Sequence, residues 1–314
     1  MNASDILPAT LPDFAMADWT AHQLARVEDA LSLWVAHPDY RPAPASLGDA
    51  MRYAVLDGGK RLRPLLVIAT CDAVNGRAEA ALRAACAVEL IHAYSLVHDD
   101  MPCMDNDVLR RGKPTVHVKF GQAQALLAGD ALQALAFEIL TPETHDTAKA
   151  VMQARLCRLL ARSAGHQGMA GGQAIDLASM GCALTSAELH QMHRLKTGAL
   201  LEASVKMGAA CGVVTPVVEA TLADYAAAIG LAFQVVDDIL DVTADATTLG
   251  KTAGKDAAQD KPTFVSLLGL DASKAYADDL LARALDSLDG LHAEGFSNTA
   301  ALRALATRLV DRTY

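Results

Sequence analysis

Hydrophobic positions recur at helical spacing along most of this chain. Apolar residues return every three or four positions over long stretches, which places them on one face of a helix. β-Branched runs are short, which favours packed helices over sheet. The pattern predicts helices, with ends placed to within a few residues, over 18–37, 44–57, 63–74, 77–98, 120–139, 144–165, 185–209, 219–243, 262–269, 272–293 and 298–312.

Glycine and proline mark the breaks between these helices. None of the breaks has the length of an interdomain linker. We therefore expect one all-α domain over residues 1–314, a single large helical bundle, with 1–17 as a flexible N-terminal segment. The breaks fall at Pro38 to Pro44, Gly58-Gly59, Gly112 to Pro114, Gly171-Gly172, Pro216 and Gly250 to Pro262.

Composition and charge exclude several classes of protein. The chain has 314 residues, 52% of them hydrophobic, which is enough for a large core and excludes a disordered chain. Its formal charge of −10 leaves no basic stripe that could neutralise a nucleic-acid backbone. We therefore expect a globular protein that does not bind nucleic acid.

Cysteine usage and the apolar stretches indicate a soluble, cytoplasmic protein. The six cysteines form no C-x-x-C pair, so neither a zinc site nor a disulfide framework is indicated, and a reducing compartment fits. The segment through Met16 carries acids and two prolines instead of a secretory signal. Asp130 and Glu138 interrupt the longest apolar stretch, so we expect no stable membrane insertion.

Two aspartate-rich clusters, at Asp99 to Asp105 and at Asp237 to Asp241, lie within apolar, helix-forming sequence. Buried carboxylates are costly unless they meet cations. Magnesium is usually held by one or two carboxylates together with substrate phosphates. A solvated acidic face or a helix N-terminus would explain one such cluster, but two clusters with apolar flanks favour a diphosphate substrate bridged by metal.

The two clusters differ in their expected geometry. Asp237 and Asp241 are four residues apart, so their carboxylates emerge on one helix face and can share metal ions. Pro102 breaks or kinks the helix of the first cluster, so a local bulge must bring Asp105 back toward Asp99.

Basic residues gather at four places that suit a phosphate. Free backbone N–H groups at a helix start, with cations beside them, form an anion site. A loop that carries lysines can close over bound phosphates. An ordinary turn, solvated surface charges or a plain surface loop would explain each place by itself. The four places are Gly58 to Pro64 with Lys60 and Arg63, then Arg110-Arg111, then Lys196-Thr197-Gly198, and the loop with Lys251, Lys255 and Lys261.

Six segments stand in a distinctive order and spacing, namely GGKRLRP, HAYSLVHDDMPCMDNDVLRRGKPTVH, GGQAID, KTGALLEA, FQVVDDILD and LGKTAGKD. They resemble the trans-polyprenyl diphosphate synthases, most closely the bacterial farnesyl diphosphate synthases, over about residues 44–312. The resemblance implies an all-α bundle of the isoprenoid synthase type around a deep central cavity. It also implies a homodimer and about three Mg2+ ions shared with the substrate diphosphates.

Carried over position by position, the resemblance assigns the charged residues to three groups. The magnesium ligands are Asp99, Asp105 and Asp237, with Asp100, Asp238 and Asp241 as ligands or supports. The residues that bind isopentenyl diphosphate are Lys60, Arg63, His92 and Arg111. The residues that bind the allylic diphosphate are Arg110, Lys196, Thr197, Gln234 and Lys251, with Lys261 in the same loop.

Other positions are left without a firm role or depart from the family pattern. Gln173 and Asp176 match an element near the metal site whose role is open. Arg312 matches the basic C-terminus that covers the isopentenyl site, although Thr313-Tyr314 departs from that ending. Val108 stands where many relatives carry another aspartate, and we expect metal binding to survive because Asp99 and Asp105 remain.

The implied reaction is ionisation, condensation and elimination. The allylic diphosphate leaves with help from magnesium, Arg110 and Lys196, and isopentenyl diphosphate attacks the resulting cation. Loss of a proton to the departing diphosphate then gives a product five carbons longer. No protein base is required, so His92 is expected to donate a hydrogen bond to diphosphate; a satisfied histidine on a buried helix is the alternative.

Product length is expected to depend on residues upstream of Asp99, because the tail extends along that helix at about 1.5 Å per residue. Small Ser95 lets a chain grow past ten carbons, and Tyr94 matches the bulky stop of bacterial farnesyl synthases. On a helical wheel Tyr94 lies roughly 140° from Asp99, so its role comes from the resemblance. We expect (2E,6E)-farnesyl diphosphate, with geranyl or geranylgeranyl diphosphate as alternatives.

Three other classes fit the sequence less well. A di-iron bundle needs two E-x-x-H pairs, and only Glu89 to His92 provides one. A terpene cyclase would leave the anion site at GGKRLRP without a use. A non-catalytic partner subunit would be expected to lack one acidic cluster, and both are intact.

Overall fold

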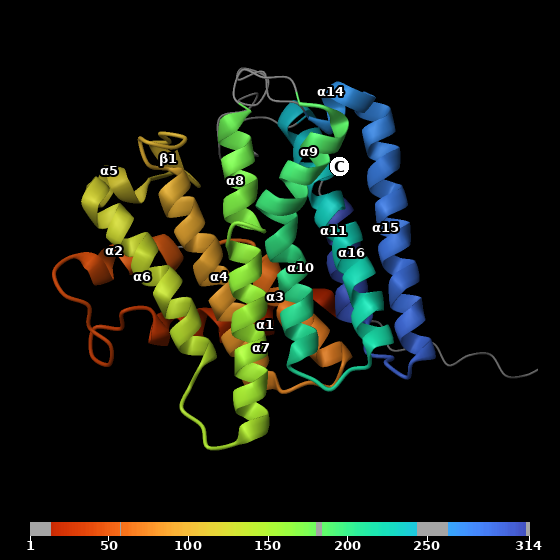
Figure 1. Ribbon diagram of the computed structural model, residues 1–314, viewed down its shortest axis with the longest axis horizontal. Helices are drawn as coiled ribbons and strands as arrows, with labels where there is room; N and C mark the ends of the chain where they lie inside the picture. Colours follow the sequence, from red (N-terminus) through yellow and green to blue (C-terminus); the bar gives the residue numbers. More distant parts are fainter. Residues whose placement is uncertain (1–13, 57, 180–183, 244–262, 312–314) are drawn as a thin grey trace, which may run out of the picture.

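The computed structural model describes residues 14–56, 58–179, 184–243 and 263–311, and almost all regular structure in them is helical (Figure 1). One short antiparallel hairpin pairs Leu109 with Pro114 and Arg110 with Lys113. The elements are α1 (Met16–Trp34), α2 (Leu47–Val55), α3 (Leu62–Ala73), α4 (Ala78–Asp99), β1 (Leu109–Arg110), β2 (Lys113–Pro114), α5 (Val116–Phe120), α6 (Gln122–Leu140), α7 (Thr147–Ala164), α8 (Met169–Ala178), α9 (Ser186–His193), the π-helix η1 (Arg194–Gly198), α10 (Ala199–Ala210), α11 (Pro216–Thr243), α14 (Phe264–Leu268), α15 (Leu270–Ala293) and α16 (Ala300–Val310).

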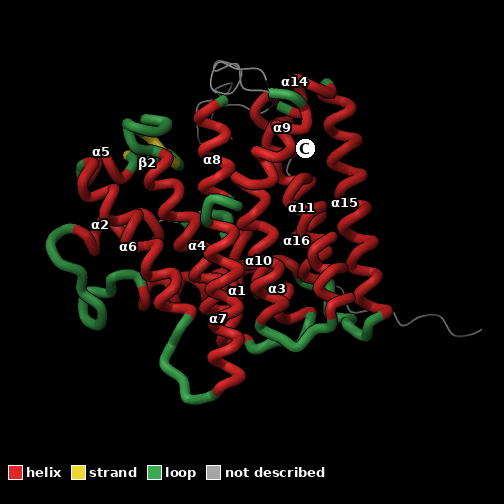
Figure 2. The backbone as a smooth tube through the Cα atoms, in the orientation of Figure 1, coloured by secondary structure: helices red, strands yellow, loops and turns green. Residues whose placement is uncertain are grey.

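Helix α4 lies inside the bundle. Its apolar residues are buried around nearly the whole circumference, including Ala84, Val88, Leu90 and Ile91, which is the property of a central helix. Helices α2, α5 and α6 lie on one side of it and α11, α15 and α16 on the other (Figures 1 and 2). The C-terminal end of α4, which carries Asp99, reaches the same end of the bundle as the β1–β2 hairpin (Figure 1).

The predicted helices are found, α5 and α8 were not among those predicted, and the described part differs from the prediction at three further points. The expected helix over 185–209 is divided into α9, η1 and α10, because a π-helical turn interrupts it. Helix α1 begins at Met16, inside the segment expected to be flexible, while residues 1–13 lie outside the described part. The expected break at Gly171-Gly172 is wrong, since both glycines lie in α8.

The position of Gly172 has a packing reason. A Cβ atom on Gly172 would lie 2.1 Å from the backbone nitrogen of Lys196. The glycine therefore lets α8 approach η1 more closely than any side chain would allow. A contact between segments so far apart in the sequence gives no local signal, which is why the two glycines resemble a helix break.

Two helices of the described part, α4 and α6, are long and apolar enough to cross a membrane by length and composition. Asp130 and Glu138 do lie within α6, as the sequence indicated. Of the most apolar window of α4, 67% is buried inside the protein, as in the core helix of a bundle.

Candidate active site

The first acidic cluster forms a tight turn at the end of α4. The helix ends at Asp99, and the backbone N–H of Asp105 donates to the carbonyl of Asp99 at 2.9 Å. Asn106 has φ 51°, in the left-handed region that asparagine tolerates, and its N–H donates to the carbonyl of Met101 at 3.1 Å. The bulge predicted from Pro102 is therefore confirmed, because the chain returns Asp105 to Asp99.

Asp99 lines a cavity of about 360 Å3 that lies among α4, α8, η1 and α10. Lys196 and Thr197 line it from η1, and Tyr94 and Ser95 line it from α4. Burial raises the pKa of Asp99 to about 6; Lys196 opposes this shift and Asp105 adds to it. A buried carboxylate of this kind would be stabilised by a cation in the cavity.

Lys196 is held at the edge of this cavity by Asp176 of α8, with which it forms an ion pair. The side chain amide nitrogen of Gln173, one turn earlier on α8, is buried without a hydrogen-bond partner. A buried N–H group without a partner suits a ligand oxygen. The structure thus places Asp176 beneath Lys196 and Gln173 in the cavity wall, two positions whose roles were open in the sequence.

A second cavity, of about 490 Å3, collects the basic residues. It shares Arg63 and His92 with the first cavity, so the two cavities adjoin. The Nε atom of Arg63 is buried without a partner, which suits an anionic ligand. The predicted isopentenyl-binding residues Lys60, Arg63, His92 and Arg111 meet here with Arg110, and the acidic residues Glu89, Asp107 and Asp237 also line the cavity.

His92 is neutral in this setting. Burial, together with the nearby guanidinium groups of Arg63 and Arg111, holds the pKa of its imidazole well below the usual range. A neutral imidazole retains one N–H group, so it can donate a hydrogen bond without adding charge.

The glycine pair before α3 allows Arg111 to contact the loop. Arg111 Nη1 donates to the carbonyl of Gly58 at 2.6 Å. A Cβ atom on Gly59 would lie 2.8 Å from the same nitrogen, and Gly59 has φ 145°. The loop therefore needs glycine both for its backbone and for the space that Arg111 occupies.

Two residues that the sequence did not single out support the basic cavity. Arg61 is buried and begins α3 in the left-handed conformation, with φ 45°. Its Nη1 lies 2.7 Å from Glu89 Oε1, its Nε lies 2.8 Å from Glu28 Oε1, and its Nη2 donates to the carbonyl of Val55 at 2.6 Å. Glu89 also offsets the charge of Arg63. In the sequence, Glu89 could have been noticed through its E-x-x-H pattern with His92. In the structure, this glutamate is the counter-charge to Arg61 and Arg63.

The second aspartate of each cluster lines neither of the two adjoining cavities. Asp100 is buried and accepts from Arg110 on both oxygens, at 2.6 Å from Nη2 and 2.8 Å from Nε. Asp238 is buried and accepts from the backbone N–H of Phe264 at 2.7 Å, where α14 begins. Both carboxylates therefore act structurally in this arrangement. Asp241 is buried in the same helix as Asp237.

Gln234 lies apart from the residues with which it was grouped. Its amide is 3.1 Å from His193 Nδ1, and it lines a third cavity, of about 410 Å3, with His190 and Arg283. Neither of the two adjoining cavities includes it. The lysines of the predicted lid, Lys251, Lys255 and Lys261, and also Arg312, lie outside the described residues.

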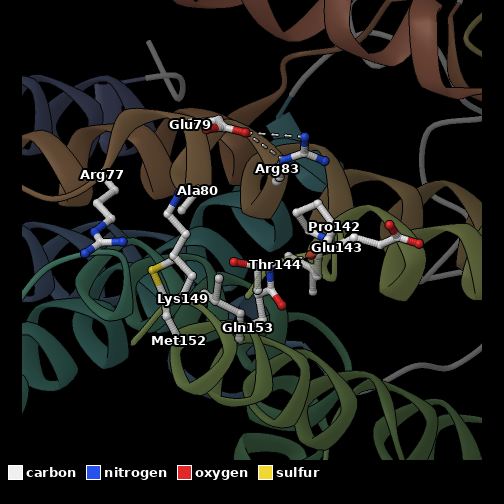
Figure 3. Close-up of a pocket in the computed structure, with 12 residues that line it drawn as sticks. Arg77, Glu79, Ala80, Arg83, Pro142, Glu143, Thr144, Lys149, Met152 and Gln153 are labelled. Atoms are coloured by element: carbon white, nitrogen blue, oxygen red, sulfur yellow. Dashed lines mark hydrogen bonds and ion pairs between the residues drawn. The ribbon is translucent and has the colours of Figure 1, made fainter. Parts of the chain in front are cut away.

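A smaller cavity, of about 150 Å3, lies where α4 begins, at the other end of that helix from Asp99 (Figure 3). Arg77, Arg83 and Lys149 line it, but so do Glu79 and Glu143. Arg83 is hydrogen-bonded to Glu79 in the figure. Basic and acidic residues are mixed in this lining, and none of the predicted site residues lies there.

The acidic residues suit a magnesium ion whose remaining ligands come from a bound substrate. Within the described ranges, no three histidine, cysteine or acidic side chains converge closely enough to hold a metal by themselves. Magnesium prefers oxygen ligands and is commonly held by one or two carboxylates and substrate phosphates. The carboxylates of Asp99 and Asp237, at adjoining cavities with unpaired donors, fit this pattern.

Comparison with known proteins decides the family. The sequence profile of the family described as polyprenyl synthetase matches residues 44–291. The chain belongs to the polyprenyl synthetase family. Members of this family are trans-prenyltransferases of isoprenoid biosynthesis, so the present polyprenyl synthetase is an enzyme. Its all-α fold is that of its structural neighbours.

The relatives of this polyprenyl synthetase differ in product. It is 47% identical to a farnesyl diphosphate synthase of Haemophilus influenzae, over 85% of this chain and 89% of the relative. It is also 47% identical to a chloroplastic geranylgeranyl pyrophosphate synthase of Capsicum annuum, over 86% of this chain and 72% of the relative. Sequence similarity alone therefore does not fix the product.

Two solved structures are similar over nearly the whole chain. An FPP/GFPP synthase of Zymomonas mobilis has a TM-score of 0.81 and 41% identity, covering 94% of this chain and 98% of that one. A geranyltransferase of Helicobacter pylori, complexed with magnesium and isoprenyl diphosphate, has a TM-score of 0.81 and 34% identity, covering 96% and 99%.

Proposed function

We propose that this enzyme condenses isopentenyl diphosphate with dimethylallyl or geranyl diphosphate and releases (2E,6E)-farnesyl diphosphate. The observation that carries this proposal is the pair of adjoining cavities, one basic and one with apolar walls, which share Arg63 and His92. Two diphosphate substrates need two anion sites, whereas a cyclase needs one. The side chain of Tyr94 in the apolar cavity supports a product of limited length.

The basic cavity suits isopentenyl diphosphate. Lys60, Arg63 and Arg111 supply positive charge, and neutral His92 supplies a hydrogen bond. Glu89 beneath them offsets part of this charge, which leaves the cavity able to release a product diphosphate.

The cavity with Asp99 suits the allylic substrate. Lys196 lies where it neutralises charge on the departing diphosphate, and its contact with Asp176 fixes its position. Leu177 and Leu200 provide apolar walls that exclude water from the allylic cation. Attack by the isopentenyl double bond forms the new carbon–carbon bond, and the departing diphosphate takes the proton that is lost.

Magnesium is the expected cofactor, with about three ions bound together with substrate. Asp99 and Asp237 would hold them from the two cavities, and Asp105, which the turn returns to Asp99, would add a third carboxylate. When bound, magnesium would supply the positive charge that makes diphosphate a good leaving group. Asp100 and Asp238 would contribute by fixing Arg110 and the start of α14.

The enzyme is also proposed to be a homodimer that assembles through α6. Leu126 and Leu127 on this helix are 47% and 51% exposed, and the neighbouring Val118 of α5 is 50% exposed. An exposed cluster of large apolar side chains on an apolar helix is typical of an interface between subunits. The single domain, with its free buried Cys71 and Cys86, suits a reducing cytoplasm.

Product analysis tests the proposed function. The purified enzyme is incubated with magnesium, isopentenyl diphosphate and either dimethylallyl or geranyl diphosphate, and the dephosphorylated alcohols are separated. Farnesol as the main product supports the proposal. Geranylgeraniol would keep the reaction and overturn the chain length, and the absence of any condensation product would exclude a synthase.

A further inference from the structure

Tyr94 and His98 form an aromatic pair on one face of α4. They are four residues apart, which places one above the other, and their ring centroids are 5.7 Å apart at an interplanar angle of 77°. This edge-to-face geometry is favourable for aromatic rings. Both side chains line the cavity that holds Asp99, so the pair forms part of the wall that a growing tail would meet.

Helix α6 has a notch that receives His98. A Cβ atom on Gly129 would lie 2.0 Å from His98 Nε2 and 2.5 Å from its Cδ2. No side chain other than hydrogen fits between α6 and this ring. Glycine is unfavourable inside a helix, and the space taken by the imidazole accounts for its presence here.

A hydrogen bond fixes the imidazole in the notch. His98 Nε2 lies 3.1 Å from the carbonyl oxygen of Leu126. Because a carbonyl oxygen can only accept, Nε2 carries the proton and donates it. One turn beyond Gly129 on α6, the side chain of Gln133 is hydrogen-bonded to the hydroxyl of Tyr94. Gly129 and Gln133 of α6 therefore hold the two rings of α4 side by side.

We propose that His98 is a specificity-determining residue, which holds the ring of Tyr94 as the end wall of the cavity because it is itself seated against Gly129. Product length is then set by α6 as well as by α4. This inference rests on the proposed function, since it concerns the direction in which the allylic tail grows.

Two substitutions should shift product length in opposite directions. His98→Ala vacates the space beside Gly129, so Tyr94 can turn toward α6 and the cavity lengthens. Gly129→Ala pushes the imidazole out of the notch and toward the cavity, which shortens it. We expect the ratio of twenty- to fifteen-carbon product to rise about tenfold in His98→Ala, and ten-carbon product to accumulate by a similar factor in Gly129→Ala.

Three further variants separate this effect from general damage. His98→Gln keeps an N–H donor for the carbonyl of Leu126 and should restore the fifteen-carbon product. The double variant His98→Ala with Gly129→Ala removes the clash, so it should fold and resemble His98→Ala even where Gly129→Ala alone does not fold. Gly290→Ala serves as the matched control, since its Cβ atom would meet Thr221 Cγ2 at 3.4 Å, an ordinary contact.

The outcomes distinguish the inference from the function on which it rests. If the unsubstituted enzyme makes no condensation product, the proposed function fails. If it makes farnesyl diphosphate and His98→Ala leaves the product ratio unchanged, the role of His98 is overturned and the function stands. A shift to shorter product in His98→Ala would also overturn it.

Discussion

At the scale of single residues, the supports of the site matter as much as the residues that face the cavities. Arg61 and Glu89 form a buried ion pair beneath the basic cavity. Removing one partner of such a pair leaves the other charge buried and unpaired, which commonly costs about 3–5 kcal/mol. We expect Arg61→Met to lower the free energy of unfolding by that amount in urea titration.

The control for this prediction is Arg41→Ala. Arg41 pairs with Glu138 at the surface, where both side chains are well exposed, and such pairs contribute about 0–1 kcal/mol. Equal losses in the two variants would show that the pair at Arg61 is no more important than a surface contact.

Asp99 makes stability depend on pH. Its folded-state pKa is about 6, whereas an unfolded aspartate has a pKa of about 3.9. The folded protein therefore binds the additional proton in this window, and the free energy of unfolding falls as pH rises from about 4 to about 6. In metal-free buffer at pH 7, Asp99→Asn should be more stable than the unsubstituted protein by on the order of 3 kcal/mol.

Urea unfolding with a chelator at several pH values measures this difference. It should nearly vanish at about pH 3, where the carboxyl group is largely protonated in both states. A difference that is constant with pH would contradict the assignment to Asp99.

At the scale of elements, the approach of α8 to η1 positions Lys196. Gly172→Ala would place a methyl group 2.1 Å from the backbone nitrogen of Lys196, so η1 must shift. We expect kcat/KM for the allylic substrate to fall at least about tenfold, since small displacements of positioned groups are costly in catalysis. The KM for isopentenyl diphosphate should change much less, because Lys196 does not line the basic cavity.

Steady-state kinetics with each substrate varied in turn tests this. Gly290→Ala, at an exposed position of α15, provides the comparison. Equal effects on both substrates would mean that the close approach supports the whole fold and has no particular role for Lys196.

At the scale of the whole molecule, α6 is the expected centre of the subunit interface. Leu127→Glu places a charge on its exposed apolar face and should shift the enzyme from dimer to monomer in light scattering. Val213→Glu, at a residue that is 96% exposed in a loop, should leave the assembly unchanged. A dimer that persists in Leu127→Glu would place the interface elsewhere.

The fold was largely predictable because helical periodicity is a local signal, and the cavities were predictable only in part. The expected isopentenyl-binding residues do meet in one cavity. The different contacts of Asp100 and Asp238 could have been predicted from the sequence, since adjacent residues lie about 100° apart around a helix and therefore face different neighbours. The pairing of Arg61 with Glu89, the π-helical turn and the contact of Gln234 with His193 arise from packing between distant segments. No local pattern contains that information.

The wall shared by the two cavities has a thermodynamic consequence. Arg63 and His92 line both cavities, so with substrates bound as proposed, an occupant of one cavity would alter the charge and the freedom of groups that the other occupant meets. Binding of the two diphosphates is then coupled, and the coupling is reciprocal. By whatever factor isopentenyl diphosphate changes the affinity for the allylic partner, the allylic partner changes the affinity for isopentenyl diphosphate by the same factor.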